Sequence, residues 1–178
     1  MYSFFIWIDA DSCPLPVKNY VIDMAKAKNL NVNFVANHEI SHPKNNPLFK
    51  MIICEKKEGA ADNFIFENAE KNDIVITRDI PFAGRLVEKG IFVMNDRGTV
   101  FTKDNIHERL SERNFNLNLA QLGLSEKNAS RYGNRELKKF ADCFERKTSQ
   151  LIVNENFSKK TKNISQCPQQ SHLPQTQN

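Results

Sequence analysis

The sequence predicts an α/β fold in which a mostly parallel central sheet is covered by helices on both faces. Short apolar runs of strand length alternate with longer segments whose apolar residues recur at helical spacing, as in successive β-α-β units. The run DIVIT at 73–77 is almost continuously apolar, which is typical of a parallel strand buried on both faces. The length of 178 residues favours one domain with a substantial core.

The first half of the chain supplies three expected strands and two helices. Pro14 and Pro16 lie where the first helix begins, because proline is tolerated in a first helical turn. From Val17, apolar residues recur at helical spacing as far as about Lys28–Asn29. We therefore expect strands at 4–8, 31–36 (whose residues alternate) and 50–54, helices at 17–28 and 60–69, and a polar loop at 37–47.

The second half continues the same alternation. Gly90 ends a helix that begins at Pro81, and the segment from Ser158 has almost nothing to bury. We expect a mobile polar connection at 117–133, strands at 73–77, 91–94 and 100–102, the last at an edge, and helices at 81–89, 104–115 and 134–152. The expected organisation is a domain at 1–153 and a disordered polar tail at 154–178.

Composition excludes several classes of protein. No apolar run approaches the roughly 20 residues of a membrane span, so we expect no membrane partner. The N-terminal apolar stretch is short, lacks a basic lead-in and ends in Asp9, unlike a secretory signal, which favours a cytoplasmic location. The cysteines show neither a C-x-x-C pair nor zinc spacing, so we expect free thiols.

The net charge of +4 gives only weak support for a nucleic-acid partner. Residues 158–178 carry three lysines and no acidic residue, which leaves about +1 for the rest of the chain. Any surface that binds nucleic acid must therefore come from the local placement of basic residues. The sequence leaves the oligomeric state open.

Four aspartates occupy positions where a parallel sheet places its ligands. Asp9 and Asp11 follow the first strand, Asp79 follows the DIVIT strand, and Asp62 lies in the first turns of the helix after the third strand. Carboxylates that converge without basic residues between them indicate a bound cation, because like charges repel. Hard divalent ions such as Mg²⁺ or Mn²⁺ prefer these oxygen ligands. The alternative is that each aspartate only caps a helix.

Each of these residues has an expected role. Asp9 and Asp79 are the best metal ligands, because each ends a core strand. Asp62 can reach the metal or its water, and Asp11 serves as a ligand or as a nearby base. Thr77 can bind a carboxylate or a water through its hydroxyl group. Such a site activates water for phosphodiester cleavage.

Several segments of the chain together resemble the bacterial YaiI/YqxD family over roughly residues 4–150. They are WIDADSCPLPVKNYV, VANHEI, GAADNFI, DIVITRDIPFAGRLVEKG and NDRGTVFTKDNIHERL, in this order. The resemblance implies a Rossmann-like, PIN-like sheet and the metal-dependent nuclease chemistry of PIN domains. Their carboxylate cluster matches Asp9, Asp11, Asp62 and Asp79, and the Thr77–Asp79 pair resembles their T-x-D signature.

The chain departs from this family pattern at two positions. Many relatives carry an acidic residue where this chain has Gly59, and relatives commonly have proline where it has Asp96. The pattern includes Arg97, so we expect Lys18, Thr77 and Arg97 to contact the substrate. His38 and His42 lie in a loop without a third ligand nearby, so we do not expect them to bind metal.

Three functions remain open on the sequence. The first is a divalent-metal-dependent nuclease, with RNA favoured over DNA as its substrate. The second is a non-catalytic nucleic-acid-binding module of the same fold, which the glycine at position 59 favours. The third is a phosphohydrolase of the haloacid-dehalogenase type, in which Asp9 is the nucleophile and Asp11 the acid. Cys13 occupies a position that is usually threonine or valine in that family, which argues against it.

Overall fold

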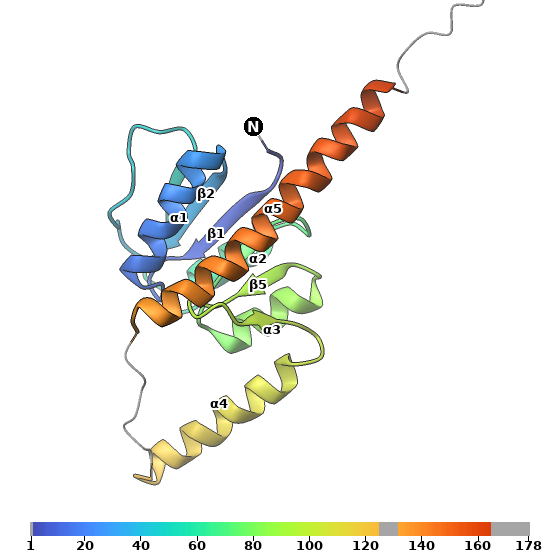
Figure 1. Cartoon of the computed structure of the whole chain (residues 1–178). Helices are drawn as coiled ribbons and strands as arrows, with labels where there is room; N and C mark the ends of the chain where they lie inside the picture. The colour runs from blue at the N-terminus through green and yellow to red at the C-terminus, as the bar shows by residue number, and fades with distance from the viewer. Residues whose placement is uncertain (1, 125–131, 165–178) are drawn as a thin grey trace, which may run out of the picture.

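Six strands form one sheet in the order β3-β2-β1-β4-β5-β6. The structure is a computed structural model that describes residues 2–124 and 132–164, and Figure 1 shows its ribbon. The first five strands are parallel, and β6 pairs antiparallel with β5 at the edge. The α/β class with a mostly parallel sheet is thus confirmed. The strands are β1 (Phe5–Asp9), β2 (Asn31–Ala36), β3 (Phe49–Ile53), β4 (Ile74–Ile76), β5 (Phe92–Met94) and β6 (Val100–Phe101).

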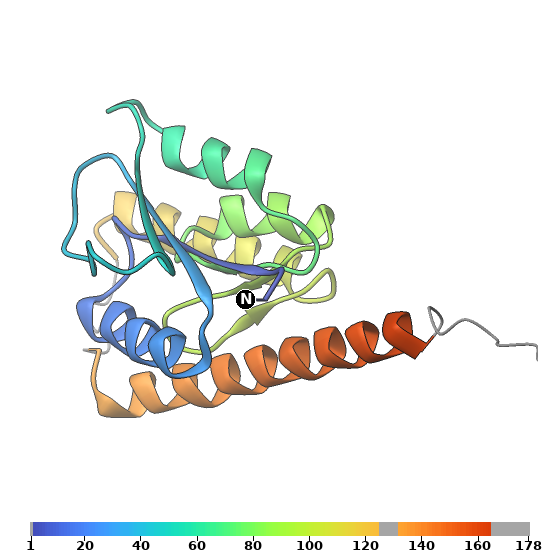
Figure 2. The ribbon, with the colours of Figure 1, turned by 90° about the horizontal axis from the view of Figure 1, so that it is seen from above.

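Helices cover both faces of the sheet (Figure 2). Buried residues of α1 and α5 share one core cluster with the sheet, and buried residues of α2, α3 and α4 share the other. The helices are α1 (Leu15–Lys28), α2 (Ala60–Asn68), α3 (Ile80–Glu88), α4 (Ile106–Gln121) and α5 (Asn134–Ile164). None of the helices in the described ranges is both long enough and apolar enough to cross a membrane.

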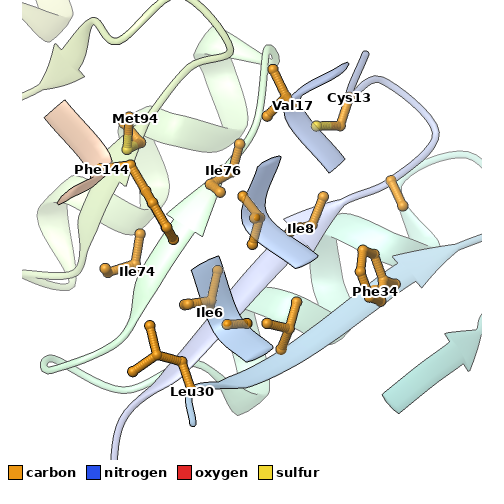
Figure 3. Close-up of a cluster of buried hydrophobic side chains, with 14 of the residues drawn as sticks. Ile6, Ile8, Cys13, Val17, Leu30, Phe34, Ile74, Ile76, Met94 and Phe144 are labelled. Carbon is orange, nitrogen blue, oxygen red and sulfur yellow. The ribbon is translucent and has the colours of Figure 1, made fainter. Parts of the chain in front are cut away.

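Strand β1 contributes to both core clusters because its side chains alternate between the two faces. Ile6 and Ile8 pack toward α1 and α5, as the close-up in Figure 3 shows, whereas Trp7 packs toward α2 and α3. All six residues of β2 are buried, including Asn31 and Asn33. The strand is therefore covered on both faces, as is usual for a strand inside a parallel sheet.

Two helices are longer than the sequence analysis expected. Helix α4 continues to Gln121, so the expected connection at 117–133 begins as helix, and its residues 125–131 lie outside the described part. No glycine or proline interrupts α4 before Gly123, whose positive φ of 73° allows the chain to leave the helix. Helix α5 runs to Ile164 for the same reason and enters the segment 154–178. The division into a domain and a tail stays a prediction, and residues 165–178 lie outside the described part.

Candidate functional site

Asp9 lies at the carboxyl end of β1, beside the end of the neighbouring strand β4. Ile8 pairs with Ile76, so the next residues of the two strands, Asp9 and Thr77, emerge together at the sheet edge. Asp9 Oδ2 accepts hydrogen bonds from Thr77 Oγ1 at 2.9 Å and from Ser12 Oγ at 2.7 Å. Its side chain is fixed, while Oδ1 accepts no hydrogen bond within the described residues.

Asp79 begins helix α3 at the end of β4. Its Oδ1 accepts the backbone N–H of Phe82 at 2.7 Å, and this bond caps the helix. Its own backbone N–H donates to Thr77 Oγ1 at 3.1 Å. The capping role that the sequence left as an alternative is therefore real for Asp79. The capping hydrogen bond uses only Oδ1 of Asp79, since Oδ2 makes no hydrogen bond in the part of the chain that the structure describes.

Asp62 lies in the first turn of α2 and is half-buried. Burial raises the pKa of its carboxyl group to about 6, the negative charges of Asp9 and Asp79 add to this rise, and Arg85 opposes it. Neither oxygen of Asp62 makes a hydrogen bond or an ion pair with another described residue. The electrostatic interactions show that residues from β1, α2 and the start of α3 come together, as the sequence predicted.

The electrostatics of Asp9 show the same crowding of carboxylates. Asp9 is only 6% exposed. Burial is the largest cause of the rise in its pKa, and the charges of Asp11 and Asp79 raise it further. The hydroxyl groups of Ser12 and Thr77 lower the pKa, because their hydrogen bonds stabilise the ionised carboxylate. The hydroxyl groups of Ser12 and Thr77 thus stabilise the ionised form of Asp9, whereas burial and the neighbouring carboxylates destabilise it.

Asp11 faces the loop that follows β2. Its Oδ2 accepts the backbone N–H of Asn37 at 3.0 Å, and its Oδ1 lies 3.1 Å from Nδ1 of His38. Asp11 and His38 border a cavity of about 540 Å³ whose lining includes both carboxylates and basic side chains. The cavity is lined by Asp9, Asp11, Asn37, His38, Lys56, Lys57, Glu58, Gly59, Ala60, Ala61 and Asp62.

The donor chemistry of this edge fits a hard divalent cation, because the converging groups are carboxylates. Asp9 Oδ1, Asp79 Oδ2 and both oxygens of Asp62 are not engaged in hydrogen bonds with described residues. As the side chains stand, however, no three His, Cys, Asp or Glu residues in 2–124 and 132–164 are grouped as metal ligands. The residues therefore have the oxygen ligands that a divalent cation prefers. Their side chains, in the conformations of this structure, do not converge on one coordination point.

The three residues expected to contact substrate have different surroundings. Lys18 Nζ donates to the carbonyl oxygen of Ala10 at 3.2 Å, close to the aspartates. Thr77 is only 1% exposed, so its place behind Asp9 suits it to position the carboxylate. Arg97 faces α5 instead: its guanidinium lies 3.9 Å from Glu136 and 5.9 Å from the ring centre of Tyr132.

Sequence reasoning missed several residues of the site. Ser12 bonds Asp9 from three positions along the chain, a spacing that could have been recognised. Asn37 and His38 reach Asp11 because β2 lies directly beside β1, and this strand order cannot be inferred from the local sequence.

Cys13 is buried, which raises the pKa of its thiol to about 12. The thiol therefore stays protonated near neutral pH, as expected for a packing residue.

A comparison with protein families matches residues 7–150 to the family described as "Uncharacterized BCR, YaiI/YqxD family". The chain belongs to the YaiI/YqxD family. A relative named UPF0178 protein in Treponema denticola is 44% identical over 140 residues, which is 79% of this chain and 88% of the relative. Another from Treponema pallidum is 40% identical over 83% of this chain and 82% of its own length.

A third YaiI/YqxD relative, the UPF0178 protein of Myxococcus xanthus, is 35% identical over 84% of this chain and 97% of its own length. The matched region of the family includes Asp9, Asp11, Asp62 and Asp79, together with Thr77. No solved structure matches the chain. The names of these YaiI/YqxD relatives state no activity, so the function has to be argued from the site.

Proposed function

We propose that this protein is a divalent-metal-dependent nuclease that hydrolyses phosphodiester bonds, with RNA favoured over DNA. One observation carries the proposal. Carboxylates from three separate elements, Asp9, Asp62 and Asp79, interact at the carboxyl edge of a parallel sheet and keep oxygens free of hydrogen bonds with described residues. Repulsion among these three carboxylates destabilises the folded protein, and a bound cation would compensate it.

Asp9, Asp62 and Asp79 are the residues that would hold Mg²⁺ or Mn²⁺, and Asp11 lies next to them. A bound ion of this kind supplies an activated water and charge compensation for the leaving oxygen. Ser12 and Thr77 orient Asp9 through their hydroxyl groups. Burial and the negative charges of Asp9 and Asp79 raise the pKa of Asp62 to about 6, and a bound divalent cation would favour its ionised form by opposing that repulsion.

The basic residues around the cavity support an anionic substrate. Lys56 and Lys57 line it with the carboxylates, and His38 lies at its border. Lys18 is held nearby through its bond to Ala10. A phosphodiester backbone needs such local positive charge, since the chain as a whole is only weakly basic.

The test is titration of Mn²⁺ by calorimetry into the full chain and into the double variant Asp9→Asn/Asp79→Asn. Circular dichroism checks that both are folded. We expect saturable binding to the wild type and none to the variant. Metal-dependent cleavage of labelled single-stranded RNA should be lost in the same variant. Binding that is equal in the two proteins, or absent from both, would contradict the proposal.

One observation favours a second candidate, a nucleic-acid-binding module without catalysis. No three His, Cys, Asp or Glu residues are grouped for a metal among the described residues, and Gly59 offers no side chain where the family resemblance implies an acid. Gly59 immediately precedes α2 as its N-cap, with a φ of 73° and open space where a side chain would begin. RNA binding that is unaffected by EDTA and accompanied by no cleavage would favour this module.

A further inference from the structure

Helix α4 packs on the rest of the fold mainly through its first two turns. Ile106 is 4% exposed, and a side chain at Gly84 of α3 would meet both Ile106 and Leu110, so the two helices approach closely there. Farther along, every residue from Asn114 to Leu124 is exposed except Leu119. The last turns of α4 extend away from the rest of the ribbon in Figure 1.

The exposed half of α4 carries large apolar side chains on one side. Phe115 is 62% exposed, and Leu122, the residue that ends the helix, is 72% exposed. Together with Leu119 they follow the spacing i, i+4, i+7, so they lie on the same face of the helix. We call Phe115, Leu119 and Leu122 the outer seam of α4. A group of exposed apolar side chains of this kind indicates a contact with another molecule.

The outer seam is distinct from the apolar side that α4 turns toward α3. Ile106, Leu110 and Leu117 form that inner side, where Leu117 and Ile80 line a cavity of about 350 Å³. Leu117 follows Phe115 by two residues, which is a rotation of about 200° around a helix. The outer seam therefore faces away from α3, and the described residues leave it largely uncovered.

Two segments of the chain lie outside the described residues and could be considered as a cover. Residues 125–131 have the sequence SEKNASR, and residues 165–178 have the sequence SQCPQQSHLPQTQN. Leu173 is the one Leu, Ile, Val, Met, Phe, Tyr or Trp residue in these two segments. Their composition does not match a seam of three large apolar side chains, so the counterpart of the seam lies on another molecule.

The charge pattern of α4 favours a second copy of this chain as that molecule. No Lys, Arg, Asp or Glu occurs from Asn114 to Leu124, although 26% of the chain is charged. A contact between identical surfaces brings like charges together unless it is uncharged, and this stretch meets that condition. Nucleic acids and anionic membranes need basic side chains for their phosphates, which the stretch does not offer.

We propose that two copies of this chain pair through the outer seams of α4, with the two helices antiparallel about a twofold axis. Phe115 and Leu122 lie at nearly equal distances on either side of Leu119, so this pairing sets Leu119 against its own copy and Phe115 of each copy against Leu122 of the other. Spacings of four and three residues are those of a coiled-coil seam. The pairing does not depend on the proposed nuclease activity.

The size of the seam predicts the strength of the pairing. A large aromatic side chain buries roughly 150–250 Å² when it is fully covered, so the part-exposed seam and its flanking residues contribute on the order of 400 Å² per copy. This is about half of the roughly 800 Å² that each partner buries in a standard interface. We therefore expect a weak dimer, with a dissociation constant on the order of 10–100 µM, that dissociates on dilution.

The test is analytical ultracentrifugation of the full chain from about 1 µM to about 500 µM, in EDTA. The wild type should change from monomer to dimer over this range. Phe115→Lys and Leu122→Glu should each weaken the dimer by about 10-fold or more, because each places a charge against an apolar side chain. Both positions are exposed in the single chain, so both variants should fold, as circular dichroism checks.

The double variant Phe115→Lys/Leu122→Glu tests the antiparallel arrangement. It places opposite charges across the twofold axis at both ends of the seam, so it should dimerise more tightly than either single variant, and more so at low salt. The matched control is Val153→Glu on α5, because Val153 is also an apolar helix residue and is 64% exposed. This control should dimerise as the wild type does.

Three results would overturn the proposal. A wild type that stays monomeric at every concentration would leave the outer seam to a different protein. A dimer that persists in both single variants, or that is lost in Val153→Glu, would place the contact elsewhere on the chain. A double variant that is no better than the single variants would exclude the antiparallel pairing of Phe115 with Leu122.

Discussion

Thr77 Oγ1 donates a hydrogen bond to Asp9 Oδ2 across 2.9 Å and accepts one from the backbone N–H of Asp79 at 3.1 Å. One buried hydroxyl group therefore joins Asp9 of β1 to Asp79, which follows the neighbouring strand β4. Its position fixes the direction of the Asp9 carboxylate and the start of helix α3 together. Outer groups of this kind hold ligands in orientation at metal sites.

Removal of this hydroxyl group should weaken both the fold and the metal site. We expect Thr77→Val to lower the free energy of unfolding by about 1–3 kcal/mol, because Asp9 and the N–H of Asp79 each lose a buried partner. Affinity for Mn²⁺ should fall by about 10-fold or more. Urea denaturation and calorimetry measure the two effects. Thr77→Ser, which keeps the hydroxyl group, is the control, and a Thr77→Val protein with unchanged Mn²⁺ affinity would show that the bond does not position a ligand.

Two substitutions of Asp79 separate its capping role from its proposed metal role. Asparagine can still accept the backbone N–H of Phe82, whereas alanine cannot. We expect Asp79→Ala to be about 1 kcal/mol less stable than Asp79→Asn. Cleavage activity should be lost to a similar extent in both, because both remove the negative charge. Thermal denaturation and an RNA cleavage assay provide the measurements, and full activity in Asp79→Asn would show that Asp79 is only a helix cap.

Asp62 should make the stability of the protein depend on pH. Its pKa of about 6 in the folded protein exceeds the ordinary value of 3.8, so the folded state keeps a proton that the unfolded state releases. Stability therefore falls as pH rises from about 4 through 6, and the ionised carboxylate remains unfavourable above that window. Asp62→Asn removes this effect. Because the group is half-exposed, we expect a gain of only about 1 kcal/mol, or 2–4 °C in Tm, at pH 7.5.

The Asp62→Asn experiment is done in EDTA, so that metal binding does not obscure the comparison. The gain in Tm over the wild type should shrink at pH 4.5, where the wild-type carboxyl group is protonated in the folded state. Asp23→Asn, at an exposed position of α1, is the control without an expected gain. An equal gain at both pH values would mean that Asp62 stays ionised throughout, contrary to the raised pKa.

The sequence predicted the sheet and the meeting of the aspartates because both depend on local patterns. An almost continuous apolar run marked β4, and acids directly after strands had to meet at one edge of a parallel sheet. The far ends of α4 and α5 were harder to predict, because polar residues also extend a helix where no glycine or proline stops it.

Contacts between distant segments were not accessible from the sequence. Asp11 meets His38 only because β1 and β2 are neighbours, and Asp96 meets Arg78 only because β4 and β5 are. Local spacing does not state which loops face each other. The burial of Asp96 comes from the packing of the turn against α5 and could not be inferred from an aspartate in a polar turn.

Asp73 provides a contrast, because it is a buried acid with a structural role at the opposite end of β4. Its Oδ1 accepts the backbone N–H of Phe5 at 2.8 Å, and its Oδ2 accepts Trp7 Nε1 at 2.8 Å and the N–H of Glu70 at 2.9 Å. In Asp73→Asn, an NH₂ group must face at least one of these donors. We expect a loss of about 2–4 kcal/mol in the free energy of unfolding.

This loss should leave the proposed metal site intact, since Asp73 lies just before the start of β4, whereas Asp9 and Asp79 lie at the carboxyl ends of β1 and β4. Mn²⁺ affinity, measured well below the lowered Tm, should match that of the wild type. Asn72→Ala, at the exposed neighbouring position, should change neither stability nor affinity. A weaker metal affinity in folded Asp73→Asn would show that the two ends of β4 are coupled. Unchanged Mn²⁺ affinity would show that Asp73 has a purely structural role, distinct from that of the aspartates that we propose to bind metal.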